Sequence, residues 1–134
     1  MNTQANSTLS EMLPPDVAAA LADFQRRLLR RFPQGIRQVI LYGSYARGEA
    51  EPGSDVDVMV VVDWDDPQRM GGYYLGRPSD PRWTQIVDAA VDAMIAHGPF
   101  ISVLVVDERL FRSNWPVARA ARREGKVLWK NPRT

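Results

Sequence analysis

The sequence contains no cysteine and only one histidine, His97. The lack of thiols excludes a disulfide framework, a thiolate metal site and a cysteine nucleophile, and it fits the reducing cytoplasm. With a single imidazole, a zinc centre and a Ser-His-Asp triad are both poor candidates. Any chemistry therefore has to come from carboxylates, hydroxyls, basic side chains or the backbone.

Long hydrophobic segments are absent as well. No run approaches the ~18 apolar residues that a membrane helix needs. The polar start, MNTQANSTLSEM, has neither the basic nor the apolar part of a signal peptide. We therefore expect no membrane segment. The 134 residues, of which 45% are hydrophobic, are enough for one domain with its own core.

The net charge is only +1, but the charges are unevenly distributed along the chain. Residues 49–66 hold seven acidic residues and no Lys or Arg, whereas residues 109–134 hold eight basic residues against Glu124 alone. The acidic segment suits cations, and the basic segment suits anions or an acidic partner. A solvated surface without a partner is the alternative for the basic segment.

The alternation of periodic segments predicts one α/β domain over residues 13–134, after a disordered tail over residues 1–12. Helices are expected over residues 16–31, 82–96, 108–112 and 116–124, and strands over residues 36–42, 55–63, 100–106 and 126–129. Residues 64–81 form a long loop rich in glycine and proline. This loop is a candidate for substrate contact through Met70, Tyr73, Tyr74 and Arg77, with ordinary loop packing as the alternative.

Two groups of polar residues belong to the helices. Four arginines, Arg26, Arg27, Arg30 and Arg31, fall on the side of the first helix away from its apolar face, where solvation explains them better than nucleic-acid contact. His97 follows the second long helix and is expected to cap its C-terminus.

The stretch LYGSYARGEAEPGSDVDVMVVVD, residues 41–63, carries most of the chemistry. Asp55 and Asp57 open the second strand, where the alternation of side chains puts them on one face about 6.6 Å apart. Two buried carboxylates at this spacing repel each other and call for a compensating cation. Oxygen ligands without His or Cys favour Mg²⁺ or Mn²⁺ over zinc. The alternative is a purely structural carboxylate pair that holds Ca²⁺ or water.

A glycine-serine turn precedes this carboxylate pair. Gly43 allows the backbone to approach a ligand closely, and Ser44 is expected to cap the short helix that follows. The serine hydroxyl, the backbone amides and the start of the helix together suit phosphate oxygens. A phosphate cradle beside a carboxylate-bound magnesium is an arrangement suited to phosphoryl or nucleotidyl transfer.

The pattern G-S-x10-D-x-D, here Gly43-Ser44 followed by Asp55 and Asp57, resembles the signature of the DNA polymerase β nucleotidyltransferase superfamily. The longer string GSYARGEAEPGSDVD is similar to the bacterial branch called minimal nucleotidyltransferases. The resemblance covers about residues 17–129, although its specific part is residues 43–57. It implies a palm-like α/β domain with a mixed sheet and helices packed on that sheet.

The resemblance also implies roles for single residues. Gly43 and Ser44 would hold the β and γ phosphates of ATP or another nucleoside triphosphate, and Asp55 and Asp57 would bind Mg²⁺ or Mn²⁺. Arg47 is a further candidate for a phosphate contact, with pairing to a nearby glutamate as the alternative. The implied reaction moves a nucleoside monophosphate, AMP from ATP, to a hydroxyl of a protein or small molecule.

Minimal nucleotidyltransferases often accompany a small helical toxin of the HEPN type, so the resemblance implies an antitoxin with a protein partner. A second copy of the chain is the other expected partner, whereas nucleic acid and membranes are not expected. Active members of the superfamily carry a third carboxylate on a later strand, but the equivalent strand FISVLVV offers only Ser102. Asp107, at the end of that strand, is expected to cap the next helix, with a catalytic substitute for the third carboxylate as the alternative. The alternative function is therefore a catalytically impaired, nucleotide-binding antitoxin that neutralises its toxin by direct binding.

Overall fold

The structure is a computed structural model that describes residues 9–64 and 72–132. Its centre is a four-stranded sheet with strand order β3-β2-β1-β4. The strands are β1 (Ile36–Tyr42), β2 (Val56–Val62), β3 (Ile101–Asp107) and β4 (Lys126–Lys130). β1 is antiparallel to both of its neighbours, whereas β2 and β3 are parallel. The predicted α/β class with a mixed sheet is confirmed.

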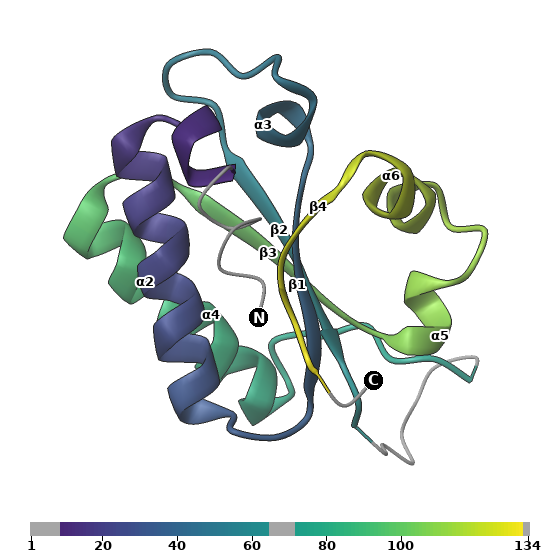
Figure 1. Cartoon of the computed structure of the whole chain (residues 1–134). Helices are drawn as coiled ribbons and strands as arrows, with labels where there is room; N and C mark the ends of the chain where they lie inside the picture. Colours follow the sequence, from purple (N-terminus) through teal and green to yellow (C-terminus); the bar gives the residue numbers. More distant parts are fainter. Residues whose placement is uncertain (1–8, 65–71, 133–134) are drawn as a thin grey trace.

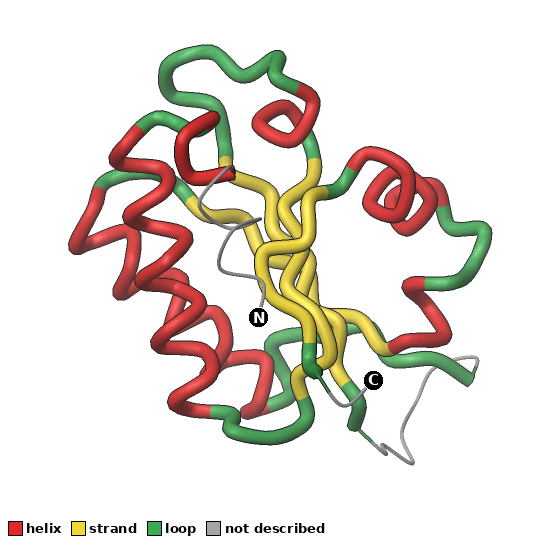
Figure 2. The backbone as a smooth tube through the Cα atoms, in the orientation of Figure 1, coloured by secondary structure: helices red, strands yellow, loops and turns green. Residues whose placement is uncertain are grey.

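Helices cover both faces of this sheet (Figure 1). The two long helices, α2 (Pro15–Arg31) and α4 (Pro81–His97), lie side by side on one face. The shorter α5 (Glu108–Phe111) and α6 (Pro116–Glu124) lie on the other face, and α3 (Ser44–Arg47) connects β1 to the turn before β2 (Figure 2). Within the described residues, no helix is both long and apolar enough to cross a membrane.

The apolar run of β2 is explained by burial on both faces. Val58, Val60 and Val62 belong to the core under the long helices. Met59 and Val61 belong to the second core, under α5 and α6. Because side chains alternate along a strand, Asp57 lies on the face of Met59 and Val61, at the end where this strand begins.

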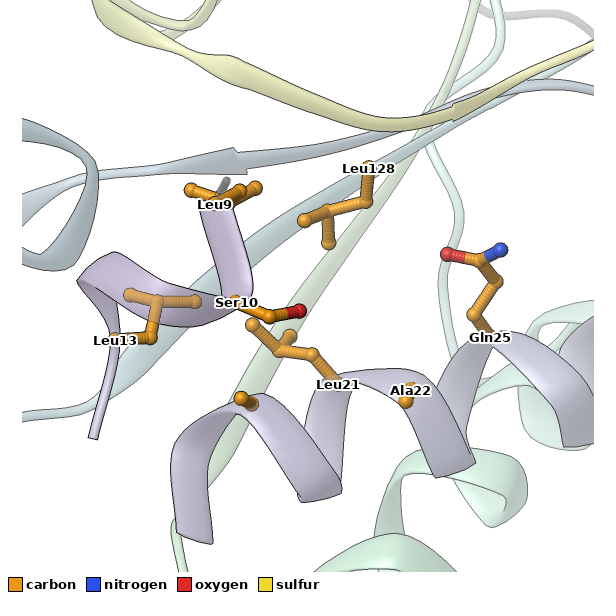
Figure 3. A pocket seen from close by; sticks show the side chains of 8 residues that line it. Leu9, Ser10, Leu13, Leu21, Ala22, Gln25 and Leu128 are labelled. Carbon is orange, nitrogen blue, oxygen red and sulfur yellow. The ribbon is translucent and has the colours of Figure 1, made fainter. Parts of the chain in front are cut away.

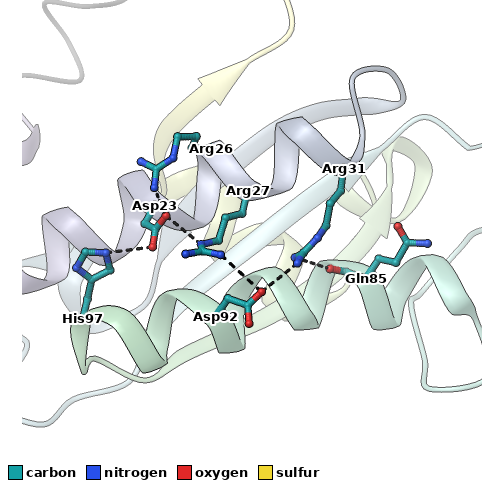
Figure 4. A network of polar contacts seen from close by, with 7 residues as sticks. All are labelled: Asp23, Arg26, Arg27, Arg31, Gln85, Asp92 and His97. Carbon is teal, nitrogen blue, oxygen red and sulfur yellow. Dashed lines mark hydrogen bonds and ion pairs between the residues drawn. The ribbon is translucent and has the colours of Figure 1, made fainter.

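A buried carboxylate on α2 organises the contact between the two long helices (Figure 4). Asp23 accepts hydrogen bonds from Arg26 and from Nε of Arg27, at 3.0 Å for Arg27. Nε2 of His97, the last residue of α4, lies 3.1 Å from Oδ2 of Asp23. Burial opposes the ionised form of Asp23, but the hydrogen bonds and charges of Arg27, Arg26 and His97 outweigh burial and lower its pKa.

This network corrects two expectations about polar residues on the helices. Arg31 is not merely solvated, because its Nη2 lies 3.0 Å from Oδ2 of Asp92 on α4, and Arg27 approaches the same carboxylate at 3.7 Å. His97 does not cap α4, since the N–H of Gly98 donates to the carbonyl of Met94 instead. The sequence pattern could not show that α2 and α4 are neighbours, and this contact decides both cases.

The chain near the N-terminus differs from the predicted tail over residues 1–12. Residues 1–8 lie outside the described residues, but residues 9–12 are helical. Leu9 and Leu13, one helical turn apart, pack against the core and face Leu21 and Leu128 across a pocket (Figure 3). Burial of these two leucines gives the short helix the tertiary support that propensity alone does not supply.

The segment before α4 is part of the sheet edge rather than a free loop. Leu75 bridges to Val106, the N–H of Gly76 donates to the carbonyl of Val105 at 2.8 Å, and the N–H of Asp107 donates to the carbonyl of Tyr74 at 3.1 Å. Residues 74–76 therefore cover the outer edge of β3 near its C-terminal end.

Candidate functional site

The glycine-serine turn follows directly from the end of β1. Gly43 has φ 78° and ψ −155°, a region that is essentially restricted to glycine. A β-carbon on Gly43 would overlap Oδ2 of Asp57 and lie 3.2 Å from its Cβ atom. Both the backbone conformation and the neighbouring carboxylate thus require glycine here, and Asp57 lies directly against the Gly43 backbone.

The two predicted aspartates lie together at the beginning of β2. Asp55 immediately precedes the strand and is exposed, whereas Asp57 is half-buried. Burial raises the pKa of Asp57, the charge of Asp55 raises this pKa further, and the charge of Arg47 lowers it. The structure therefore brings the two carboxylates within electrostatic reach of each other.

Asp57 has a polar neighbour on each adjacent strand. The antiparallel register places Tyr42 of β1 opposite Asp57, and the parallel register places Ser102 of β3 opposite it. The position expected for a third carboxylate is thus next to the pair, and serine occupies it. Within the described residues, no group of three or more His, Cys, Asp or Glu side chains is arranged to hold a metal ion.

Tyr42 is the residue at this site that sequence reasoning missed. Burial and the neighbouring charge of Asp57 raise the pKa of Tyr42 to about 12, so its phenol stays neutral. A neutral phenol beside a carboxylate remains available as a hydrogen-bond donor. The signal was present in the sequence, because Tyr42 ends the predicted strand immediately before the glycine-serine turn.

Ser44 and Arg47 both lie on α3, with different surroundings. Gly43, rather than Ser44, occupies the N-cap position, so the expected capping role of Ser44 is wrong. Nε of Arg47 lies 2.8 Å from Glu49, and its Nη1 lies 3.3 Å from Glu124 of α6. Hydrogen bonds to Glu49 and Glu124 raise the pKa of Arg47. The guanidinium is therefore held by two carboxylates, which was the alternative to a phosphate contact.

Asp107 lies at the far end of the sheet, away from the two aspartates. Asp107 caps α5, because its Oδ1 accepts from the N–H of Leu110 at 2.9 Å, and its register partner is Val62. It lies at the opposite end of β3 from Ser102 and does not replace a third carboxylate. The predicted cap is confirmed.

The expected substrate contacts from the loop before α4 are also at the far end of the sheet. Tyr74 is buried, and its hydroxyl donates to Oδ2 of Asp80 at 2.7 Å. Tyr73 packs against the second core, and Arg77 is exposed. Met70 lies outside the described residues. Since residues 74–76 pair with the C-terminal end of β3, these three residues lie away from the two aspartates.

Comparison with known proteins gives a consistent result. The sequence profile of a family described as "Nucleotidyltransferase domain" matches residues 21–117. A protein of Methanocaldococcus jannaschii, provisionally named a protein adenylyltransferase, is 29% identical over 112 residues, which are 82% of this chain and 95% of that protein. Protein adenylyltransferase MntA of Thermococcus cleftensis is 40% identical over 45 residues, which are 34% of this chain and 43% of that protein.

Solved structures share the fold at lower identity. A toxin–antitoxin crystallised with AMP-PNP matches with a TM-score of 0.50 and 19% identity, over 82% of this chain and 73% of the other. A mutant of the toxin–antitoxin MntA-HpeT matches with a TM-score of 0.50 and 17% identity, over 81% of this chain and 73% of the other. At these identities the likeness shows the shared fold alone.

Proposed function

The chain belongs to the nucleotidyltransferase domain family, and from this premise we propose that it transfers AMP from ATP to a hydroxyl group of a protein. The observation that carries the proposal is the contact of the Asp57 carboxylate with the Gly43 backbone, next to Asp55. This contact joins the two halves of the motif, the glycine-serine turn and the pair of acids, into one site. The relatives named protein adenylyltransferases support a protein as acceptor.

The carboxylate pair fits a divalent cation. Each acid offers oxygen ligands, which Mg²⁺ and Mn²⁺ prefer, and the pKa of Asp57 is raised by burial and by the charge of Asp55. A cation between them would remove this repulsion. Bound Mg²⁺ would neutralise triphosphate charge and stabilise the pyrophosphate that leaves.

The chain's own residues have separate roles in this proposal. In this proposal the β and γ phosphates bind beside the Gly43 backbone, whose missing side chain leaves room for the Asp57 carboxylate. The Ser44 hydroxyl, which makes no hydrogen bond in the part of the chain that the structure describes, donates to one of their oxygens. Asp55 and Asp57 hold the cation. Arg47 steers the triphosphate by charge, and it reaches a phosphate only by leaving Glu49 or Glu124.

The transfer is an in-line displacement at the α-phosphorus. The acceptor oxygen forms a bond to this phosphorus while the bond to the bridging oxygen of pyrophosphate breaks, and the hydroxyl proton passes to solvent. Ser102 lies beside Asp57 where a third carboxylate would otherwise accept that proton, and a neutral hydroxyl is a weak base. We therefore expect slow turnover. Because the reaction consumes ATP, we place the protein in the cytoplasm.

The same serine favours a second candidate function. In this alternative the chain is an antitoxin that binds a nucleotide but neutralises a HEPN-type toxin by contact alone. The structural neighbours that are toxin–antitoxin complexes support a protein partner for either function. Toxin neutralisation by the Asp55→Asn and Asp57→Asn variants distinguishes the two functions. Variants that still neutralise the toxin would make AMP transfer dispensable. Variants that fail to neutralise it would make AMP transfer essential.

The first experiment is a calorimetric titration of the protein with ATP, with and without Mg²⁺, repeated on Asp55→Asn and Asp57→Asn. We expect Mg²⁺-dependent binding by the unchanged protein, loss of that dependence in both variants, and no AMP transfer by Asp57→Asn. Asp63→Asn is a matched control, because Asp63 is an exposed acid just after the other end of β2. Binding that is equal in all four proteins would refute the assigned site.

A further inference from the structure

An exposed aromatic side chain lies at the beginning of β3, on the strand next to the two aspartates. Phe100 is 57% exposed. The N–H of Val56 donates to the carbonyl of Phe100 at 2.8 Å, so the parallel ladder between β2 and β3 continues one residue beyond β3. Continued by one residue, the register that pairs Val56 with Ile101 places Phe100 opposite Asp55.

The face of Phe100 follows from the same ladder. Side chains alternate along a strand, so Phe100 and Ser102 lie on one face, and Ile101 between them is buried in the core on the other. Asp55 and Asp57 alternate in the same way across Val56. Phe100 therefore lies beside the acids on the face of the candidate site.

The fold itself gives no use for this ring. Phe100 belongs to neither core, and its ring makes no aromatic or cation contact with another described residue. A phenyl ring left in water loses the free energy that its burial would provide, whereas a flat ligand stacked on it would recover part of that energy.

The order of the strands indicates which ligand could reach the ring. Gly43 follows β1, the acids lie at the beginning of β2, and Phe100 precedes β3, so these three groups follow one another across the sheet. Adjacent strands are ~4.8 Å apart, which separates β1 from β3 by about 10 Å. A nucleoside triphosphate with its β and γ phosphates at Gly43 and its α phosphate at the acids is long enough to bring its nucleoside to the beginning of β3.

We propose that Phe100 is the stacking platform for the nucleobase of the bound triphosphate. The inference rests on the proposed function, because it takes the triphosphate to lie between Gly43 and the acids. Stacking uses the π-face that every base has, so Phe100 contributes to affinity for ATP, GTP and the pyrimidine triphosphates alike. It acts on the nucleoside and not on the phosphates.

The test compares two ligands that differ only in the nucleoside. The dissociation constants of Mg²⁺-ATP and of Mg²⁺-tripolyphosphate are measured by calorimetry for the unchanged protein, Phe100→Ala, Phe100→Leu and Phe100→Trp. We expect Phe100→Ala to weaken ATP binding about tenfold or more and to leave tripolyphosphate binding unchanged. Phe100→Leu, which keeps apolar area without an aromatic face, should resemble Phe100→Ala, whereas Phe100→Trp should bind ATP at least as tightly as the unchanged protein. Val127→Ala is the control, since Val127 is 45% exposed on β4 at the other edge of the sheet.

The outcomes distinguish a failure of the stacking role of Phe100 from a failure of the proposed function. Unchanged ATP affinity in Phe100→Ala overturns the inference and leaves the proposed function intact. If this variant then transfers AMP more slowly, Phe100 contacts the acceptor and not the base. Equal weakening of ATP and tripolyphosphate also overturns the inference, because it indicates a general disturbance of the site. An unchanged protein that binds neither ligand overturns the proposed function, and the inference falls with it.

Discussion

The Asp57 carboxylate occupies the space that a β-carbon on Gly43 would need. The two residues are fourteen positions apart in sequence, and the antiparallel pairing of β1 and β2 brings them together at the end of the sheet. Their contact means that the turn and the acid pair cannot change independently. A substitution at either residue should therefore affect both the turn and the acid pair.

The first prediction concerns Gly43→Ala. The new methyl group would collide with Asp57, and the backbone would be held at φ 78° and ψ −155°, which costs a residue with a side chain ~1–3 kcal/mol. We expect a loss of at least about 2 kcal/mol in the free energy of unfolding, together with loss of Mg²⁺-ATP binding. Chemical denaturation and calorimetry measure the two effects.

Gly53→Ala is the matched control for this substitution. Gly53 also has a positive φ, 85°, but no atom lies within 4 Å of the position of its β-carbon. The control should lose about 1 kcal/mol and keep its ATP binding. Equal loss of binding in both variants would mean that backbone strain, and not the contact with Asp57, is responsible.

The second prediction concerns Ser102→Asp. Because Ser102 is the cross-strand neighbour of Asp57, this substitution places a third acid next to the pair. Without a divalent cation, the repulsion should lower stability by roughly 1–4 kcal/mol, the range for two charges ~4 Å apart in water or near a protein surface. Mg²⁺ should restore this loss, and AMP transfer should accelerate because a base is now available.

Thermal unfolding with and without Mg²⁺ measures the predicted response of Ser102→Asp. Ser102→Asn has a similar size without the charge and provides the control. If Mg²⁺ raises the melting temperature of both variants by the same amount, Ser102 does not lie within reach of the cation.

The third prediction is a pH dependence of stability at Asp80. This residue caps α4 and accepts hydrogen bonds from Arg82 and from the hydroxyl of Tyr74. The bonds to Arg82 contribute most, and together these partners lower the pKa of Asp80 to about 2. A lowered carboxyl pKa stabilises the fold above the ordinary value of 3.8, and that stabilisation disappears as the pH falls from about 4 to 2.

Asp80→Asn keeps the capping oxygen and removes the charge, so it isolates this effect. At pH 7 we expect the unchanged protein to be more stable than Asp80→Asn by about 2 kcal/mol. The difference should shrink below pH 4 and vanish near pH 2 in urea denaturation. A difference of the same size at pH 7 and pH 2 would assign it to packing.

The fourth prediction ranks two acids between the long helices. The side chain of Asp23 is 4% exposed and contacts Arg26, Arg27 and His97, whereas that of Asp92 is 40% exposed. Asp92→Ala should change stability by no more than about 1 kcal/mol, as exposed ion pairs do. Asp23→Ala should lower the melting temperature further, because it leaves several donors without their acceptor. Equal melting temperatures would contradict this ranking.

The elements of the fold were largely predictable because they depend on local patterns. The predicted strand over residues 36–42 coincides with β1, and the other strands and long helices agree within one or two residues. The helix at residues 9–12 was not predictable, because its leucines gain stability only from contact with Leu21 and Leu128. Glycine and proline marked the ends of elements, but they carried no information about which elements would become neighbours.

The amino-acid sequence by itself determined the class of fold, the strand that carries Asp55 and Asp57, and the common face of these two acids, since alternation along a strand is a property of the chain alone. Only the tertiary structure decided that Tyr42 and Ser102 lie beside Asp57 and that Glu124 of α6 holds Arg47. These contacts join segments far apart in the chain. They depend on the strand order β3-β2-β1-β4, which no local pattern specifies, because many arrangements of the same elements bury the same apolar faces.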